Sequence, residues 1–148
     1  MRTNYESDVV AWAKEQAQLI RSGRLDLLDL EHIAEEIEDV GKSEQRELAN
    51  RMAVLLAHLL KWEYQPFRRG SGWQSTIRTQ RSGITRRIHK TPSLKSSLND
   101  LDWLADAWAD GRTMASQETD IDFDTFPEIC PWSIESEILN ENWLPGTV

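Results

Sequence analysis

The sequence has little cysteine, no long apolar run and no alternation of apolar and polar residues, and each absence narrows the class of protein. Its single cysteine, Cys130, excludes an internal disulfide and fits a reducing compartment. Apolar runs stay well short of the ~18 residues that a membrane-spanning helix needs. Residues 1–10 lack the basic-then-apolar pattern of a secretion signal. We therefore expect a cytoplasmic protein that does not bind a membrane.

Helical periodicity is the dominant pattern in the chain. Short connections favour antiparallel packing of successive helices. The 148 residues match the size of one ordinary domain, and no linker divides them. The sequence therefore predicts a single domain over residues 1–148: an all-α, up-and-down helical bundle of four to five helices with a short C-terminal helix. Apolar residues recur at spacings of three and four in these segments, the last being the short helix: 7–22, 29–41, 43–64, 72–90, 91–118 and 133–139.

Glycine and proline mark the expected helix ends. Gly23 and Gly41 should end the first two helices, and Pro66 should end the third. Thr91 should cap the fifth helix, with Pro92 as its first residue. The middle of the third helix, "MAVLLAHLL", is apolar nearly all round and should be the most buried segment. The faces expected to point inward are Val9, Trp12, Ala13, Gln16, Leu19 and Ile20; Leu30, Ile33, Ala34, Ile37 and Val40; Trp73, Ile77, Ile84 and Ile88; and Leu94, Leu98, Leu101, Leu104, Ala105 and Trp108.

Charge is unevenly distributed along the chain. The net charge is −8, but residues 61–95 alone carry +8. Such a segment can bind nucleic acid, or it can pack against acidic neighbours in the same chain. The cations scatter around the helix 72–90, whereas a nucleic-acid surface would gather them in one outward stripe. We therefore favour packing within the chain.

The turn around Pro66 is expected to form a corner of the bundle. Arg81 flanks the apolar face of its helix, and Glu36 and Glu38 flank that of residues 29–41, which predicts an ion pair. Aromatic side chains should close this end, with arginines stacked on them. The residues assigned to this structural corner or binding site are Glu36, Glu38, His58, Trp62, Tyr64, Arg69, Trp73, Arg78 and Arg81.

A carboxylate–histidine metal site is the sharpest enzymatic hypothesis. "EHIAEE" offers His32 and several glutamates, and His58 lies on the following helix. The Glu-x-x-His spacing is missing, however, and His32 points outward on a helical wheel. We expect no metal, no cofactor and no catalytic residue; His58 should be a partly buried histidine bonded to a carbonyl or a carboxylate. Cys130 has no neighbouring cation to activate its thiol.

Several segments are similar to the bacterial domain of unknown function 29 family. They are "DLEHIAEEIEDVGKS", "LLAHLLKWEYQP", "GWQSTIRTQR", "TPSLKSSL", "ETDI" and "FPEICPWS", and they follow one another over roughly residues 4–145. The chain departs from this pattern at Thr79, where many relatives are expected to have Glu. The resemblance implies a helical bundle and no established activity.

Three classes of function follow, in decreasing order of preference. The first is a protein–protein interaction or assembly module without catalytic activity, with self-association as one form and with exposed aromatics such as Trp132 or Trp143 at the interface. The second, which we do not favour, is a nucleic-acid-binding module. It would use Arg68, Arg69, Arg78, Arg86 and Lys90. The third is a metal-dependent enzyme.

Overall fold

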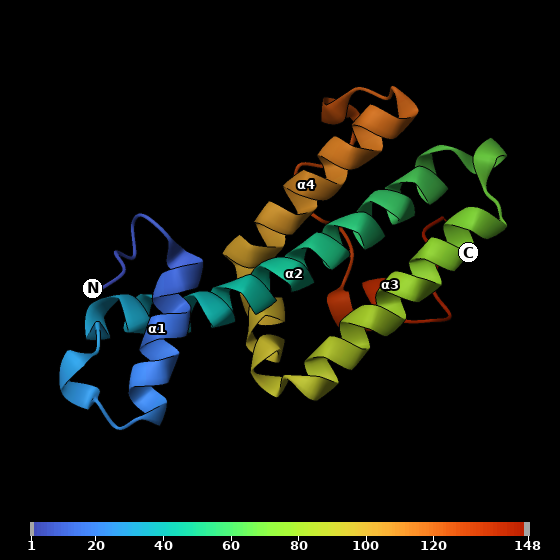
Figure 1. The fold of residues 1–148 in the computed structure, drawn as a ribbon. Helices are drawn as coiled ribbons and strands as arrows, with labels where there is room; N and C mark the ends of the chain where they lie inside the picture. The colour runs from blue at the N-terminus through green and yellow to red at the C-terminus, as the bar shows by residue number, and fades with distance from the viewer. Residues whose placement is uncertain (1, 147–148) are drawn as a thin grey trace. The chain divides into compact units, whose positions relative to one another are not determined.

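The computed structural model describes residues 2–146, which form helices and turns and no strand. The predicted all-α helical bundle is confirmed. None of the helices in the described residues has the length and apolarity to cross a membrane. The α-helices are α1 (Val9–Arg21), α2 (Leu30–Tyr64), α3 (Ser71–Lys90) and α4 (Leu101–Thr119) (Figure 1). Between and after them lie the 3-10 turns η1 (Leu25–Leu27), η2 (Pro66–Arg68), η3 (Pro92–Asn99) and η4 (Phe123–Thr125), and the π-helical turn η5 (Ile134–Ile138).

Contacts between Cα atoms divide the chain into two compact units. Unit 1 comprises residues 1–43, and unit 2 comprises residues 44–148. Helix α2 contributes its first turns to unit 1 and the rest to unit 2. The expectation of a single domain over residues 1–148 stays a prediction.

Helix α2 is continuous where two helices were predicted. Gly41 lies inside the helix and does not end it. A glycine that ends a helix usually adopts a positive φ, as Gly23 does at 77° after α1, and Gly41 does not. A single interior glycine costs only about 1 kcal/mol relative to alanine, too little to break a helix of good helix formers.

The core of unit 2 is built on the second half of α2. Every residue of "MAVLLAHLL" except Val54 and His58 is fully or almost fully buried, which confirms this segment as the most buried one. Helix α4 crosses it at Gly111, where an added Cβ would lie 3.0 Å from the Leu56 Cβ and 3.2 Å from the Ala53 carbonyl oxygen. Helix α3 contributes Ile77 and Ile84 to the same cluster.

The fifth predicted helix begins later than expected. Residues Pro92–Asn99 form a 3-10 turn, and α4 starts at Leu101 after the cap Asp100. The Asp100 carboxylate accepts hydrogen bonds from the backbone N–H groups of Asp102 and Trp103, so it competes successfully with Thr91 as the start of the helix. The prediction that Leu101 and Ala105 face the core was wrong, since both are exposed.

Unit 1 buries much less of its apolar surface than its sequence predicts. In α1, only Trp12 and Gln16 are buried, and Val9 and Ile20 are exposed. In α2, Leu30, Ile37 and Val40 are 68%, 67% and 66% exposed. The inward face predicted for residues 29–41 is therefore wrong for these side chains. Within unit 1, α1 and the first turns of α2 pack against each other but bury few of their apolar side chains.

Candidate functional site

The α2–α3 corner holds its cations on aromatic rings and backbone. The Arg69 Nε donates to the Trp62 carbonyl oxygen at 2.6 Å, and its guanidinium lies 5.2 Å from the centroid of the Trp62 ring. The Lys61 Nζ lies 5.2 Å from the centroid of the Trp73 ring and forms an ion pair with Glu118 of α4. These contacts match a structural corner in which arginines and lysines pack on aromatic side chains.

Arg81 is buried, but its predicted partners were wrong. Its side chain is 4% exposed. The Nε donates to the Ile138 carbonyl oxygen at 2.7 Å, and Nη2 donates to the Trp143 carbonyl oxygen at 2.7 Å. Burial lowers the pKa of Arg81, and the charge of Glu141 opposes that shift. Arg81 therefore ties α3 to the C-terminal segment through backbone carbonyls.

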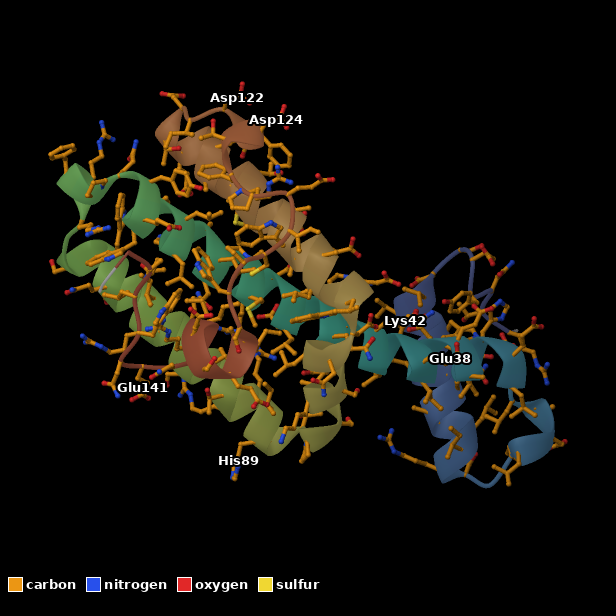
Figure 2. All side chains as sticks on the ribbon, turned by 180° about the vertical axis from the view of Figure 1, so that it is seen from behind. Glu38, Lys42, His89, Asp122, Asp124 and Glu141 are labelled. Carbon is orange, nitrogen blue, oxygen red and sulfur yellow. The ribbon has the colours of Figure 1, made fainter. Side chains whose placement is uncertain are left out.

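Glu36 and Glu38 lie on the first turns of α2, within unit 1. The Tyr5 hydroxyl donates to the Glu36 carboxylate at 2.5 Å. This hydrogen bond is the main reason that the pKa of Tyr5 is raised to about 12. Glu38 is exposed on the first turns of α2 (Figure 2). The hydrogen bonds of Arg81 go to backbone carbonyl oxygens of unit 2, those of Glu137, Ile138 and Trp143.

The remaining residues assigned to the corner are His58, Tyr64 and Arg78. His58 is half-buried, and its Nδ1 lies 2.9 Å from the Val54 carbonyl oxygen, as the sequence predicted. Desolvation lowers the pKa of His58, which favours the neutral imidazole. The Tyr64 ring stacks edge-on against Phe126 at a centroid distance of 5.0 Å. Arg78 is exposed on α3.

The side chains considered for metal binding or catalysis either make structural contacts or are not grouped together. Within residues 2–146, no three His, Cys, Asp or Glu side chains are grouped so that they could hold a metal ion. The His32 ring bonds to Asp29 and stacks on Tyr5, with centroids 4.1 Å apart. Burial raises the pKa of the Cys130 thiol, which disfavours the reactive thiolate. Absence of metal and of activity remains a prediction.

Trp132 and Trp143 are not the exposed interface residues that the sequence suggested. Their rings stack edge-on at 5.5 Å, and Trp132 stacks in the same way on the buried Trp108 at 5.5 Å. The Trp108 Nε1 donates to the Pro127 carbonyl oxygen at 2.8 Å. The tryptophans of the C-terminal segment therefore extend the core of unit 2.

Sequence reasoning missed Arg112 as a second buried arginine. Its Nη2 donates to the carbonyl oxygens of Phe123 and Phe126, both at 3.3 Å, and its guanidinium lies 3.8 Å from the centroid of the Phe123 ring. The sequence carries no clear signal for this burial, because the close helix crossing at the preceding Gly111 is visible only in the structure. Arg81 and Arg112 together fasten the C-terminal segment to α3 and α4.

Three exposed aliphatic residues of unit 1, Ile20, Ile37 and Val40, border a groove of about 340 Å³, which we call the apolar groove. It lies between α1 and the first turns of α2 and has Trp12 at its base. Glu36 is the one acidic residue in its lining, and its carboxylate is engaged by Tyr5. The groove is lined by Trp12, Ala13, Gln16, Ala17, Ile20, Ile33, Glu36, Ile37 and Val40.

The fold and its side chains define an all-α bundle protein that uses most of its buried cations to join its own elements. A protein-family model described as "Domain of unknown function DUF29" matches residues 4–144, so the chain belongs to this family. The resemblance seen in the sequence is thereby confirmed. No curated protein and no solved structure matches the chain.

Proposed function

We propose that the protein is a cytoplasmic, non-catalytic interaction module whose apolar groove binds an amphipathic helix of a partner protein. The observation that carries this proposal is the exposure of Ile20, Ile37 and Val40 at the rim of one groove. Aliphatic side chains so exposed and so close together are typical of a surface that a partner covers. A groove between two helices is a common receptor for the apolar face of a third.

Charge favours a basic partner helix. Unit 1 contains five Lys or Arg and ten Asp or Glu, which gives it a net charge of −5. A second copy of unit 1 would bring the same negative charge, so self-association through this surface is opposed by repulsion. Lysines or arginines flanking the apolar face of the partner helix would be attracted instead.

A pair of synthetic helices tests this proposal in the full-length chain. One peptide of about 20 residues carries Leu at helical spacings and Lys elsewhere; its match carries Glu in place of Lys. Fluorescence anisotropy of the labelled peptides should show that the Lys peptide binds about tenfold more tightly than the Glu peptide, or better.

Substitutions in the groove locate the binding. The Ile37→Asp/Val40→Asp variant should weaken binding of the Lys peptide by about tenfold or more, because it removes apolar contact area. The Leu101→Asp/Ile129→Asp variant is the matched control, since it adds the same charge at exposed apolar positions of unit 2. Added negative charge alone would strengthen binding of a basic peptide, so a loss confined to the groove variant isolates the apolar contribution.

Two results would count against the proposal. Equal binding to both variants would show that the peptide is held by charge alone. A molar mass in solution that corresponds to a dimer, and that falls to the monomer value in Ile37→Asp/Val40→Asp, would show that the occupant is a second copy.

A further inference from the structure

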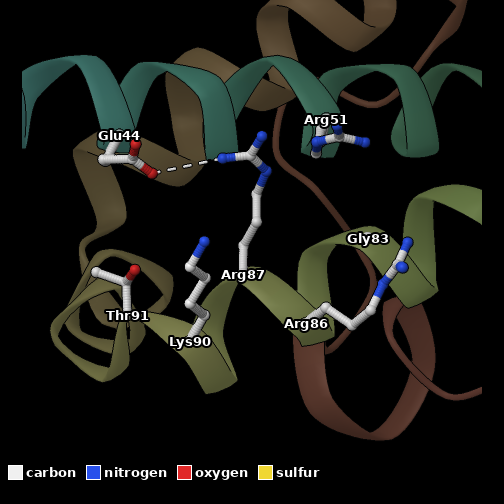
Figure 3. Close-up of a pocket in the computed structure, with 7 residues that line it drawn as sticks. All are labelled: Glu44, Arg51, Gly83, Arg86, Arg87, Lys90 and Thr91. Carbon is white, nitrogen blue, oxygen red and sulfur yellow. Dashed lines mark hydrogen bonds and ion pairs between the residues drawn. The ribbon is translucent and has the colours of Figure 1, made fainter.

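Unit 2 contains a second groove of opposite character, lying between α2 and α3. It has a volume of about 470 Å³, and its lining includes four cations: Arg51 from α2, and Arg86, Arg87 and Lys90 from α3. Figure 3 shows Arg87 and Lys90 extending from α3 toward α2. We refer to it as the cationic groove.

Only part of this positive charge is neutralised within the chain. Arg87 contacts the Glu44 carboxylate at 3.4 Å and the Glu47 carboxylate at 3.3 Å (Figure 3 draws the first). Arg51 shares Glu47 with it, at 3.4 Å. These two carboxylates therefore face four cations, which leaves two positive charges over.

The surplus lies on Arg86 and Lys90. Both side chains are exposed, and neither forms a hydrogen bond or ion pair with any residue between 2 and 146. They are four residues apart on α3, so their side chains project from neighbouring turns of one face. In Figure 3 Arg86 extends toward Gly83 and Lys90 lies on the other side of Arg87, so these two unpaired donors would reach an anion from opposite ends of the groove.

Gly83 leaves room for Arg51 at the groove wall. A Cβ added at Gly83 would lie 3.0 Å from the Arg51 Nη1, so the guanidinium rests against the backbone of α3. A side chain at position 83 would require the Arg51 guanidinium to shift by a few tenths of an ångström. The groove thus has an arginine packed against one wall and exposed cationic side chains on the other, an arrangement suited to a planar or tetrahedral oxyanion.

The helix dipole accounts for only some of these cations. Arg87 and Lys90 lie in the last turn of α3, where the negative end of the helix favours positive charge. The dipole acts within about one turn. Arg86 is outside that turn, and Arg51 belongs to another helix.

We propose that the cationic groove binds a compact, phosphate-rich anion of the pyrophosphate type. Arginine forks and a lysine are the side chains that recognise phosphate oxygens. No aromatic or large aliphatic side chain lines the groove, so it offers no surface on which a nucleobase could stack. An extended nucleic-acid backbone would need a stripe of cations, and Arg78, the next exposed arginine of α3, does not line this groove.

Isothermal titration of the full chain with pyrophosphate, up to about 5 mM, tests the proposal. The net charge of −8 opposes non-specific attraction of anions, so measurable binding must come from a local site. The Arg86→Gln/Lys90→Gln variant should weaken pyrophosphate binding by about tenfold or more. The Arg78→Gln/Lys95→Gln variant removes one exposed arginine and one exposed lysine outside the groove and should bind like the unmodified chain.

Two further arms identify the ligand chemistry. Orthophosphate should bind more weakly than pyrophosphate, because it engages fewer of the four cations. A single-stranded oligonucleotide should neither bind tightly nor displace pyrophosphate at physiological salt. Absence of pyrophosphate binding, or an equal loss in both double variants, would refute the site; tight oligonucleotide binding lost in Arg86→Gln/Lys90→Gln would replace the compact anion by a nucleic acid.

Discussion

Units 1 and 2 contain helices with similar apolar spacing, but they differ in how far these apolar side chains are buried. In unit 2, Leu55, Leu56 and Leu59 are fully buried beneath α3, α4 and the C-terminal segment. In unit 1, Leu30, Ile37 and Val40 follow the same spacing and stay exposed. The difference teaches that periodicity identifies which residues share a face of a helix. It does not show whether the chain itself covers that face.

The two units also differ in how they handle positive charge. Unit 2 buries Lys61, Arg81 and Arg112, each bonded to a carboxylate or to backbone carbonyls. In unit 1, every described Lys and Arg is exposed. Lys61 and Arg81, two of the nine cations in residues 61–95, are therefore used for internal fastening.

The largest expected difference in stability is between the replacement of a buried leucine and that of an exposed one. Leu55→Ala should lower the free energy of unfolding by about 2–5 kcal/mol, because it leaves a cavity in a fully buried cluster. Leu30→Ala, at a position 68% exposed, should change it by less than about 0.5 kcal/mol. Chemical denaturation measures both, and a similar loss in the two variants would mean that Leu30 is covered in solution.

Replacement of the buried Arg81 of α3 should have the second largest effect on stability. Arg81→Ala is expected to cost about 2–4 kcal/mol, because the carbonyls of Ile138 and Trp143 lose a charged donor. Arg78→Ala, an exposed control three residues earlier, should cost less than about 0.5 kcal/mol. Hydrogen exchange would add a spatial check, since amides of residues 134–146 should lose protection in Arg81→Ala alone.

A pair of glycine substitutions sharpens the comparison within α2 and α4. Gly111→Ala should destabilise the fold by about 1–3 kcal/mol, since its Cβ would press on the backbone of Ala53. Gly41→Ala meets open space inside a helix and should stabilise α2 by about 0.5–1 kcal/mol. Melting temperatures that move in the same direction for both would contradict the continuous α2 or the close α2–α4 crossing.

The smallest effect concerns two histidines with opposite pKa shifts. The hydrogen bond to Asp29 raises the pKa of His32 in unit 1, so its contribution to stability is present below the unfolded pKa and is lost as pH rises through the folded pKa. Burial lowers the pKa of His58 in unit 2, so its contribution is present above the unfolded pKa and is lost as pH falls through the folded pKa.

NMR titration of the imidazole protons checks this prediction directly. His32 should titrate above an unstructured histidine, and His58 should titrate below it. The upward shift of the His32 pKa should shrink in Asp29→Asn, which keeps the side-chain shape and removes the charge of the main partner. An unshifted His58 would mean that this part of α2 is more open to solvent than the buried neighbours of His58 imply.

The sequence supports prediction of the elements better than of their contacts. "MAVLLAHLL" could be recognised as buried because it is apolar on all sides, and Gly23 because a helix end needs a positive φ. The break expected at Gly41 was wrong because one glycine is too weak a signal. The place of Arg81 beside the apolar face was predicted, but its partners are backbone carbonyls, which every residue has.

The candidate site was predictable only in part. The corner residues Trp62, Arg69 and Trp73 do make aromatic–cation contacts, which composition and the Pro66 turn suggested. The cationic groove was not foreseen, because a helical wheel of α3 alone omits Arg51 and Glu47 of α2. A cluster assembled from two helices appears only when their packing is known.

The fastening of the C-terminal segment by Arg81 has a consequence for the order of folding during synthesis. Its carbonyl partners lie 57 and 62 residues further along the chain. At a typical ribosomal speed, they emerge about 3–12 s after the arginine does. The Arg81 guanidinium therefore stays hydrated until these acceptors emerge, and the C-terminal segment can dock on it only afterwards. A contact made so late should slow unfolding far more than it speeds folding.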